Sequence, residues 1–138
     1  MASVPAAIVA KGKPLRDNLD LSMRLAKMSG VKIAFGVDSF GSPEALARQN
    51  VELTRRLRWF TPVEILRQAT SVNAELFALS GPRNPYKEGP LGVIKKGAYA
   101  DLLIVDGNPL EDLSVLEDYE KNLRLIMKDG KVYKNTLK

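Results

Sequence analysis

The sequence comprises 138 residues, a length typical of one domain with a hydrophobic core of its own. A hydrophobic fraction of 45%, a charged fraction of 27% and an aromatic fraction of 7% exclude collagen-like, coiled-coil and disordered chains. The net charge of +5 is spread along the chain, with no cluster denser than the arginines at 55–58. We therefore expect a solvated basic surface and no nucleic-acid partner.

Histidine and cysteine are both absent from the sequence. Their absence excludes disulfide bonds, a self-contained Ser-His-Asp triad, a Cys-His pair and an imidazole-rich zinc site. Any chemistry must use carboxylates, hydroxyls and amines, or residues of another chain. The apolar runs, of which 6–10 is the longest and 102–105 another, are far shorter than the roughly 20 residues of a membrane-spanning helix. Residues 1–10 make a poor signal peptide, so we expect a soluble, cytoplasmic protein with no membrane partner.

The first part of the chain predicts a helix followed by a strand. Residues 1–10 contain Pro5 and are expected to form an extended lead-in. Apolar residues at three- and four-residue spacing predict a helix over Leu15–Met28 with a broad buried face. The β-rich run Val31–Val37 predicts a short buried strand that ends at Asp38 and the following Ser-Phe-Gly. A helix that leads into a strand ending in a carboxylate is typical of α/β folds.

Two further helices are predicted before the chain changes character. Ser42 is a suitable N-cap, with proline next, for a helix over 43–59. The motif Thr-Pro-Val-Glu at 61–64 is a capping box, and the apolar spacing after it predicts a helix that ends before Gly81. The stretch 81–89 is rich in turn-forming residues and indicates a boundary.

The last third of the sequence has strand-like periodicity. Strands are predicted over 92–95, 100–105, 123–128 and 131–134. Asp129-Gly130 is a two-residue turn typical of a tight hairpin. The run Leu102–Val105 is apolar without alternation, so we expect it to be buried on both faces.

Asp38 is the main candidate for a functional carboxylate. It lies where a predicted strand meets a loop, the edge at which ligands and catalytic groups gather in parallel α/β structures. Aspartate also commonly ends a strand or caps the next helix, and both interpretations remain open. Glu44 and Glu52 are expected to be exposed helix carboxylates, and Asp101 to form a turn-stabilising hydrogen bond.

Two other groups of residues have an ordinary and a functional interpretation. Thr70 and Asn73 are three residues apart on one predicted helix and can point the same way, either into a site or in a polar contact with a loop. Trp59 with the arginines at 55, 56 and 58 could form a basic aromatic patch, but neighbouring leucines favour the end of an amphipathic helix.

Four segments, in this order, carry a resemblance to a known family: VKIAFGVDSFG, TPVEILRQATSVNAELFALSG, LGVIKKGAYADLLIVDGNPLEDL and LRLIMKDGKVYKNTL. They resemble the C-terminal third of a metal-dependent amidohydrolase of the imidazolonepropionase-like and Xaa-Pro dipeptidase (prolidase)-like branch. The resemblance implies an α/β fold made of an incomplete TIM barrel, with its last strand and flanking helices in residues 1–81. Residues 82–138 would then supply C-terminal β-strands of the small β-sandwich domain.

The resemblance also implies a role for Asp38. In this family the aspartate at the end of the eighth barrel strand binds a divalent metal such as zinc, takes a proton from the metal-bound water and passes it to the departing amine. The histidine-rich metal ligands and bridging lysine of the family belong to earlier strands, and this sequence has no histidine. Because a catalytic zinc needs three protein ligands, we expect no tight metal binding by this chain alone.

The sequence therefore leaves several functional hypotheses. The first is the C-terminal portion of a hydrolase of amide or peptide carbon–nitrogen bonds, with Xaa-Pro dipeptides among its candidate substrates, inactive alone. The alternative is a non-enzymatic self-associating or scaffold module. A metal-free hydrolase using Asp38 with Glu44 or Asp101 is disfavoured. We expect a homo-oligomer or a complementing N-terminal barrel fragment, with contacts through Val31–Val37 and the helices at 15–28 and 46–60.

Overall fold

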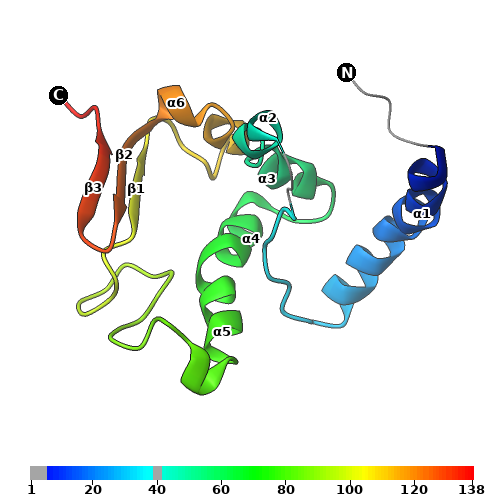
Figure 1. The fold of residues 1–138 in the computed structure, drawn as a ribbon, viewed down its shortest axis with the longest axis horizontal. Helices are drawn as coiled ribbons and strands as arrows, with labels where there is room; N and C mark the ends of the chain where they lie inside the picture. Colours follow the sequence, from blue (N-terminus) through cyan, green and yellow to red (C-terminus); the bar gives the residue numbers. More distant parts are fainter. Residues whose placement is uncertain (1–5, 39–41) are drawn as a thin grey trace. The chain divides into compact units, whose positions relative to one another are not determined.

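The computed structural model describes residues 6–38 and 42–138, and contacts divide the chain into two units, Met1–Ile33 and Ala34–Lys138. The first unit contains helix α1, Ala6–Met28 (Figure 1). The extended lead-in expected at 1–10 is wrong for residues 6–10, since helix-forming alanines start the helix directly after Pro5; residues 1–5 lie outside the described part. Pro14 is accommodated inside α1.

The broad buried face expected for the first helix is also wrong. Leu19, Leu21, Leu25 and Met28 are exposed, and Met28 retains 82% of its accessible surface. Among the described residues of this unit, α1 has no second helix or strand to pack against. The apolar stripe of α1 therefore remains an exposed face.

The second unit begins with an extended segment that is not a strand, so the strand expected at Val31–Val37 is wrong. A strand requires a neighbouring strand to satisfy its backbone groups. Here the backbone of Phe35 is hydrogen-bonded by the side chain of Asn73 instead. The segment is extended but held by side chains.

The helix expected over 43–59 is interrupted. Helix α2 spans Pro43–Ala47, α3 spans Val51–Arg55, and a 3₁₀ turn follows at Arg56–Arg58. The Ser42 cap is confirmed, because its side chain accepts a hydrogen bond from the Ala45 N–H at 3.2 Å. At the interruption, the Asn50 side chain donates to the carbonyl oxygen of Leu116 at 2.7 Å. Within the interruption the backbone N–H groups of Arg48, Gln49 and Val51 donate to carbonyl oxygens three residues earlier, so the α-helical bonding pattern is broken there.

The capping box at Thr61 and Glu64 is confirmed. It opens α4, Pro62–Arg67, which continues through a π-helical segment, Gln68–Val72, into α5, Asn73–Ala78. The apolar spacing of this stretch does not predict the π-helical segment. Ile65 of α4 is fully buried at 0% exposure. The other buried apolar residues of this unit are Leu53, Phe60, Leu113, Leu116, Leu123 and Leu125.

The C-terminal residues form a three-stranded antiparallel sheet in the order β1-β2-β3 (Figure 1). Strand β1 is Leu102–Val105, β2 is Leu123–Lys128 and β3 is Lys131–Asn135. Short helical turns precede the sheet or join its strands, a 3₁₀ turn at Gly81–Arg83, another at Leu113–Leu116, and α6 at Tyr119–Asn122.

Two strand predictions are wrong. Residues 92–95 form bends rather than a strand. Leu103 and Ile104 of β1 are 57% and 45% exposed, so β1 is not buried on both faces. Because β1 is an edge strand and no other sheet in the described residues covers it, its apolar side chains remain accessible.

The hairpin at Asp129-Gly130 is confirmed. These residues have φ values of 49° and 73°, the left-handed pair that a tight two-residue turn requires. The Asp101 carboxylate accepts a hydrogen bond from the Asp129 N–H at 2.7 Å, so its expected role in stabilising a turn is confirmed. The domain division expected at residue 81 stays a prediction.

Candidate functional site around Asp38

Asp38 ends the extended segment and is the last described residue before the gap at 39–41. Its side chain is exposed, and its backbone has a φ of 49°. Aspartate tolerates this left-handed conformation better than most residues, yet the conformation still carries a cost. The Ser-Phe-Gly that follows in the sequence lies outside the described residues. Asp38 is therefore a carboxylate presented at the end of a segment with a specific backbone geometry.

The segment that leads to Asp38 is hydrogen-bonded by Asn73 to the long helix, the continuous helix made of α4, the π-helical segment and α5. The Phe35 N–H donates to Asn73 Oδ1 at 2.9 Å, and Asn73 Nδ2 donates to the Phe35 carbonyl oxygen at 3.1 Å. One side-chain amide thus satisfies both backbone groups of one residue, as a neighbouring strand would. Asn73 begins α5 immediately after the π-helical segment.

A buried arginine holds the same segment from another side. Arg56 is only 5% exposed, and its Nη1 donates to the Ala34 carbonyl oxygen at 3.2 Å and to Gln68 Oε1 at 2.7 Å. Its Nε contacts Glu52 Oε1 at 3.2 Å, and its guanidinium lies 4.5 Å from the centre of the Phe35 ring. The free-energy cost of burying this cation is offset by its contacts with the Glu52 carboxylate, the Gln68 amide, the Ala34 carbonyl and the Phe35 ring.

The other predicted carboxylates do not join Asp38 through any described interaction. Glu44 is exposed at the start of α2, where hydrogen bonds from its own backbone N–H and from the Ser42 hydroxyl lower its pKa. Asp101 is held by the β2–β3 turn and lies 3.7 Å from Lys128 Nζ. The expected exposure of Glu52 is wrong: its side chain is 26% exposed because it pairs with the buried Arg56.

Of the predicted pair Thr70 and Asn73, only the Asn73 side chain is hydrogen-bonded to the segment before Asp38 in the described residues. The Thr70 hydroxyl donates to the Leu66 carbonyl oxygen of its own helix at 2.7 Å. The arginines near Trp59 also separate, because Arg56 is buried while Arg58 lies over the Trp59 ring at 5.3 Å. The ordinary structural interpretations of both groups are therefore supported.

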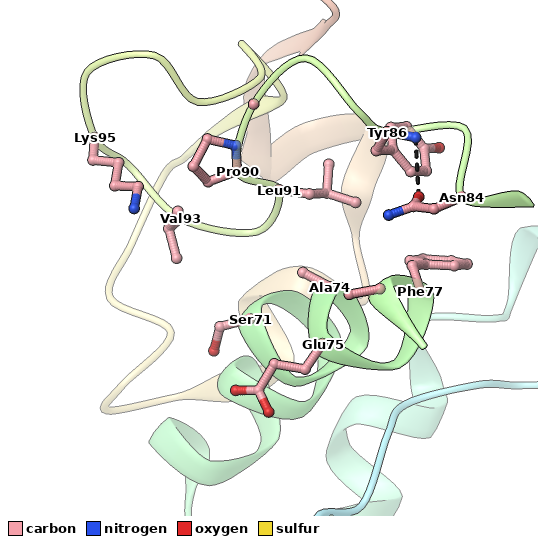
Figure 2. A pocket seen from close by; sticks show the side chains of 12 residues that line it. Ser71, Ala74, Glu75, Phe77, Asn84, Tyr86, Pro90, Leu91, Val93 and Lys95 are labelled. Carbon is pink, nitrogen blue, oxygen red and sulfur yellow. Dashed lines mark hydrogen bonds between the residues drawn. The ribbon is translucent and has the colours of Figure 1, made fainter. Parts of the chain in front are cut away.

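The hollows between described residues of the second unit include the following two. One, of about 260 Å³, adjoins the extended segment and is lined by Val37, Ala45, Arg48, Gln49, Val51, Glu52 and Arg55. The other, of about 360 Å³, lies between α5 and the loop 84–95 (Figure 2). Figure 2 shows Leu91 and Tyr86 of the loop near Ala74 and Phe77 of the helix. Only the first hollow borders the segment that carries Asp38.

The donor set of this chain does not fit a catalytic metal on its own. Over residues 6–38 and 42–138, no group of three or more histidine, cysteine, aspartate or glutamate side chains could hold a metal ion. A catalytic zinc site normally uses three protein ligands. Asp38 could supply one carboxylate at most to ligands from elsewhere. Among the described helices, none is both long and apolar enough to cross a membrane.

Comparison with known proteins shows the family. The model of the amidohydrolase family matches residues 15–133. Ochratoxinase from Aspergillus niger is 32% identical over 126 residues, covering 91% of this chain and 24% of that protein. A crystal structure of a prolidase complexed with N-methylphosphonate-L-proline is 34% identical, with a TM-score of 0.80 over 96% of this chain and 30% of that chain. The crystal structure of A. niger ochratoxinase has a TM-score of 0.71 at 29% identity, covering 91% of this chain and 27% of that chain.

The chain belongs to the amidohydrolase family, and the resemblance on the four quoted segments is confirmed. It spans about a quarter of the length of the curated relatives that it matches. Amidohydrolases are generally metal-dependent. The mixed helix and strand architecture with its small antiparallel sheet matches solved members of the family.

Sequence reasoning missed Arg56 and Gln68 as parts of this region. The i,i+4 spacing of Glu52 and Arg56 indicates an ion pair, but one that is ordinarily exposed. Nothing in the local pattern indicates that this arginine is buried against Gln68 and Ala34.

Proposed function

We propose that these residues form the C-terminal portion of a metal-dependent hydrolase that acts on amide or peptide carbon–nitrogen bonds. Family membership over residues 15–133 is the observation that carries the proposal. In this proposal, the part before residue 82 belongs to the end of a (β/α)₈ barrel, and the three-stranded sheet belongs to the small β-sandwich. The remaining barrel strands and the metal ligands come from residues that this chain does not contain.

Asp38 is the proposed catalytic carboxylate. It is exposed at the end of an extended segment, where its oxygens can accept a proton and return it to a departing amine. A carboxylate of this kind contributes typically about 10²–10⁴-fold to the rate as a general acid–base group. Xaa-Pro dipeptides are the first substrates to test, because the prolidase structure at a TM-score of 0.80 contains a proline phosphonate.

The chain alone is proposed to be inactive, because its described residues hold no complete metal-binding set. The direct measurement is hydrolysis of Xaa-Pro dipeptides and N-acyl amino acids by the purified 138-residue chain with added Zn²⁺. We expect no turnover above the rate without protein. Metal-dependent hydrolysis by this chain would show that it carries a complete site.

The role of Asp38 is tested in a chimera, in which residues 15–133 replace the matching portion of a related prolidase. The chimera should hydrolyse Xaa-Pro dipeptides, and Asp38→Asn should lower kcat by about 10²-fold or more. Asparagine tolerates the left-handed backbone, so this variant removes the charge with little backbone strain. Glu44→Gln is the matched control and should retain activity. An Asp38→Asn chimera as active as its parent would refute the role.

A self-associating or scaffold module is the second candidate, favoured by the exposed apolar surface. The exposed face of α1 includes Leu25 and Met28, and the edge strand β1 exposes Leu103 and Ile104. Large exposed apolar surfaces commonly mark interfaces. We propose that they are covered in a homo-oligomer or by a complementing barrel fragment. Light scattering over a concentration series tests this, and a chain that stays monomeric and cooperatively folded would refute self-association.

A further inference from the structure

We propose that Arg56 and Asn73 are positioning residues, which hold the backbone at Ala34 and Phe35 and thereby place the Asp38 carboxylate. The proposal rests on the proposed catalytic role of Asp38. Neither side chain is expected to touch substrate. Their described contacts with the segment are made to Ala34 and Phe35, four and three residues before Asp38.

The Asn73 contact fixes the orientation of the chain at Phe35. Its amide donates to the Phe35 carbonyl oxygen and accepts from the Phe35 N–H, at 3.1 and 2.9 Å. Two bonds to one residue restrain the peptide groups on both sides of it. At about 3.3–3.6 Å per extended residue, Asp38 lies no more than about 11 Å along the chain from this anchor.

The Arg56 contact restrains Ala34, the residue before Phe35. Its guanidinium bridges the Ala34 carbonyl oxygen to Gln68 Oε1 and lies over the Phe35 ring. Glu52 binds the remaining Nε, so the planar group is restrained in several directions. Gln68 begins the π-helical segment and Asn73 directly follows it. This helix thus supplies one anchor of the extended segment, Asn73, and the Gln68 side chain that binds the other anchor, Arg56.

The backbone of Asp38 needs such support. A non-glycine residue with a φ of 49° persists where the surrounding structure holds it, and such residues cluster at functional sites. The extended segment has no neighbouring strand among the described residues, so the two side chains replace the support that a sheet would give. Loss of the Asn73 anchor should therefore release Asp38 before it affects the buried core.

The test measures local order in the complete 138-residue chain by ¹⁵N relaxation and amide hydrogen exchange. Asn73→Ala should increase exchange of the Phe35 amide by about tenfold or more and lower the order parameter of Asp38 from about 0.85 toward 0.6. Asn73→Asp keeps the acceptor for the Phe35 N–H but places a second acceptor oxygen against the Phe35 carbonyl oxygen, so it should leave the Phe35 protection and the Asp38 order below those of the wild type. Thr70→Ala is the matched control and should change neither quantity.

The NMR signals of the fully buried Ile65 side chain show whether the core is intact in each variant. Unchanged exchange at Phe35 and unchanged order at Asp38 in a folded Asn73→Ala chain would overturn the proposal. If Asn73→Ala unfolds the chain, the same two measurements on Asn73→Asp and Arg56→Lys decide, and wild-type order at Asp38 in both would overturn it. An active Asp38→Asn chimera would refute the catalytic role of Asp38, whereas the exchange and relaxation measurements test only whether the two anchors hold its position.

Discussion

Replacement of Arg56 by methionine should destabilise the second unit strongly for a single substitution. Methionine retains the unbranched apolar part of the side chain and removes the guanidinium. The change leaves Gln68 Oε1 without its 2.7 Å donor, and the Gln68 residue is only 6% exposed. A second acceptor, the Ala34 carbonyl oxygen, also loses the Arg56 donor that lies 3.2 Å from it. Glu52, at 26% exposure, can recover part of its hydration and contributes less.

The magnitude follows from these unsatisfied groups. A buried acceptor left without a partner costs about 1–3 kcal/mol, and removal of one member of a buried ion pair costs about 3–5 kcal/mol. Because Glu52 and Ala34 are only partly buried, we expect a loss of about 2–4 kcal/mol in the free energy of unfolding. Arg55→Met, at the exposed neighbouring arginine, should change it by less than about 0.5 kcal/mol.

Urea unfolding followed by circular dichroism and by Trp59 fluorescence measures both variants. The double variant Arg56→Met/Gln68→Leu separates the two causes, because it removes donor and acceptor together and should be less destabilised than Arg56→Met. A loss below about 1 kcal/mol for Arg56→Met would refute the reasoning. A double variant whose loss of unfolding free energy equals the sum of the losses of the two single variants would also refute it.

Three further predictions concern local structure. Thr61→Ala removes the capping box of α4 and should lower the free energy of unfolding by about 1 kcal/mol in urea titrations, whereas an unchanged midpoint would contradict it. Gly92 and Gly97 have similar positive φ values of 71° and 81° but different surroundings. A Cβ at Gly92 would lie 2.5 Å from the Thr70 carbonyl oxygen, whereas a Cβ at Gly97 would meet nothing within 4 Å. Gly92→Ala should therefore cost at least about 1 kcal/mol more than Gly97→Ala, and equal melting temperatures would refute the clash. The folded-state pKa of Glu44 is lowered by hydrogen bonds from its own backbone N–H and from Ser42, so its stabilising effect is full above the ordinary carboxyl pKa and is lost as pH falls through the lowered value. An NMR titration midpoint no lower than that in the urea-unfolded chain would contradict this direction.

Local chemistry made some features predictable from the sequence. The capping box at Thr61 and the hairpin at Asp129-Gly130 depend on residues within a few positions of one another, and both are confirmed. The Ser42 cap is of the same kind. Family membership is carried by segments with characteristic order and spacing, so it was also accessible to sequence reasoning.

The errors occur where distant residues decide the structure. The run 31–37 has strand-forming residues, but its backbone is held by Asn73, 38 positions from Phe35. The helix expected at 43–59 is interrupted where Asn50 contacts Leu116, 66 positions away. The burial of Arg56 likewise depends on Gln68 and Ala34. Residue types and periodicity do not predict these pairings of distant residues. The position of Asp38 in the sequence was predictable, but the support of its backbone was not.

The π-helical segment lets the long helix lose one residue without turning Asn73 away from its partner. A π-helical turn holds an extra residue relative to an α-helical turn, and here it occupies Gln68–Val72. Deletion of one residue from it would let the α-helix run on without interruption, and the later side chains would keep about the same direction around the axis, because the π-helical segment absorbs the extra residue locally. Asn73 would still face Phe35. Relatives that lack this extra residue can therefore keep an anchoring side chain at the position equivalent to Asn73.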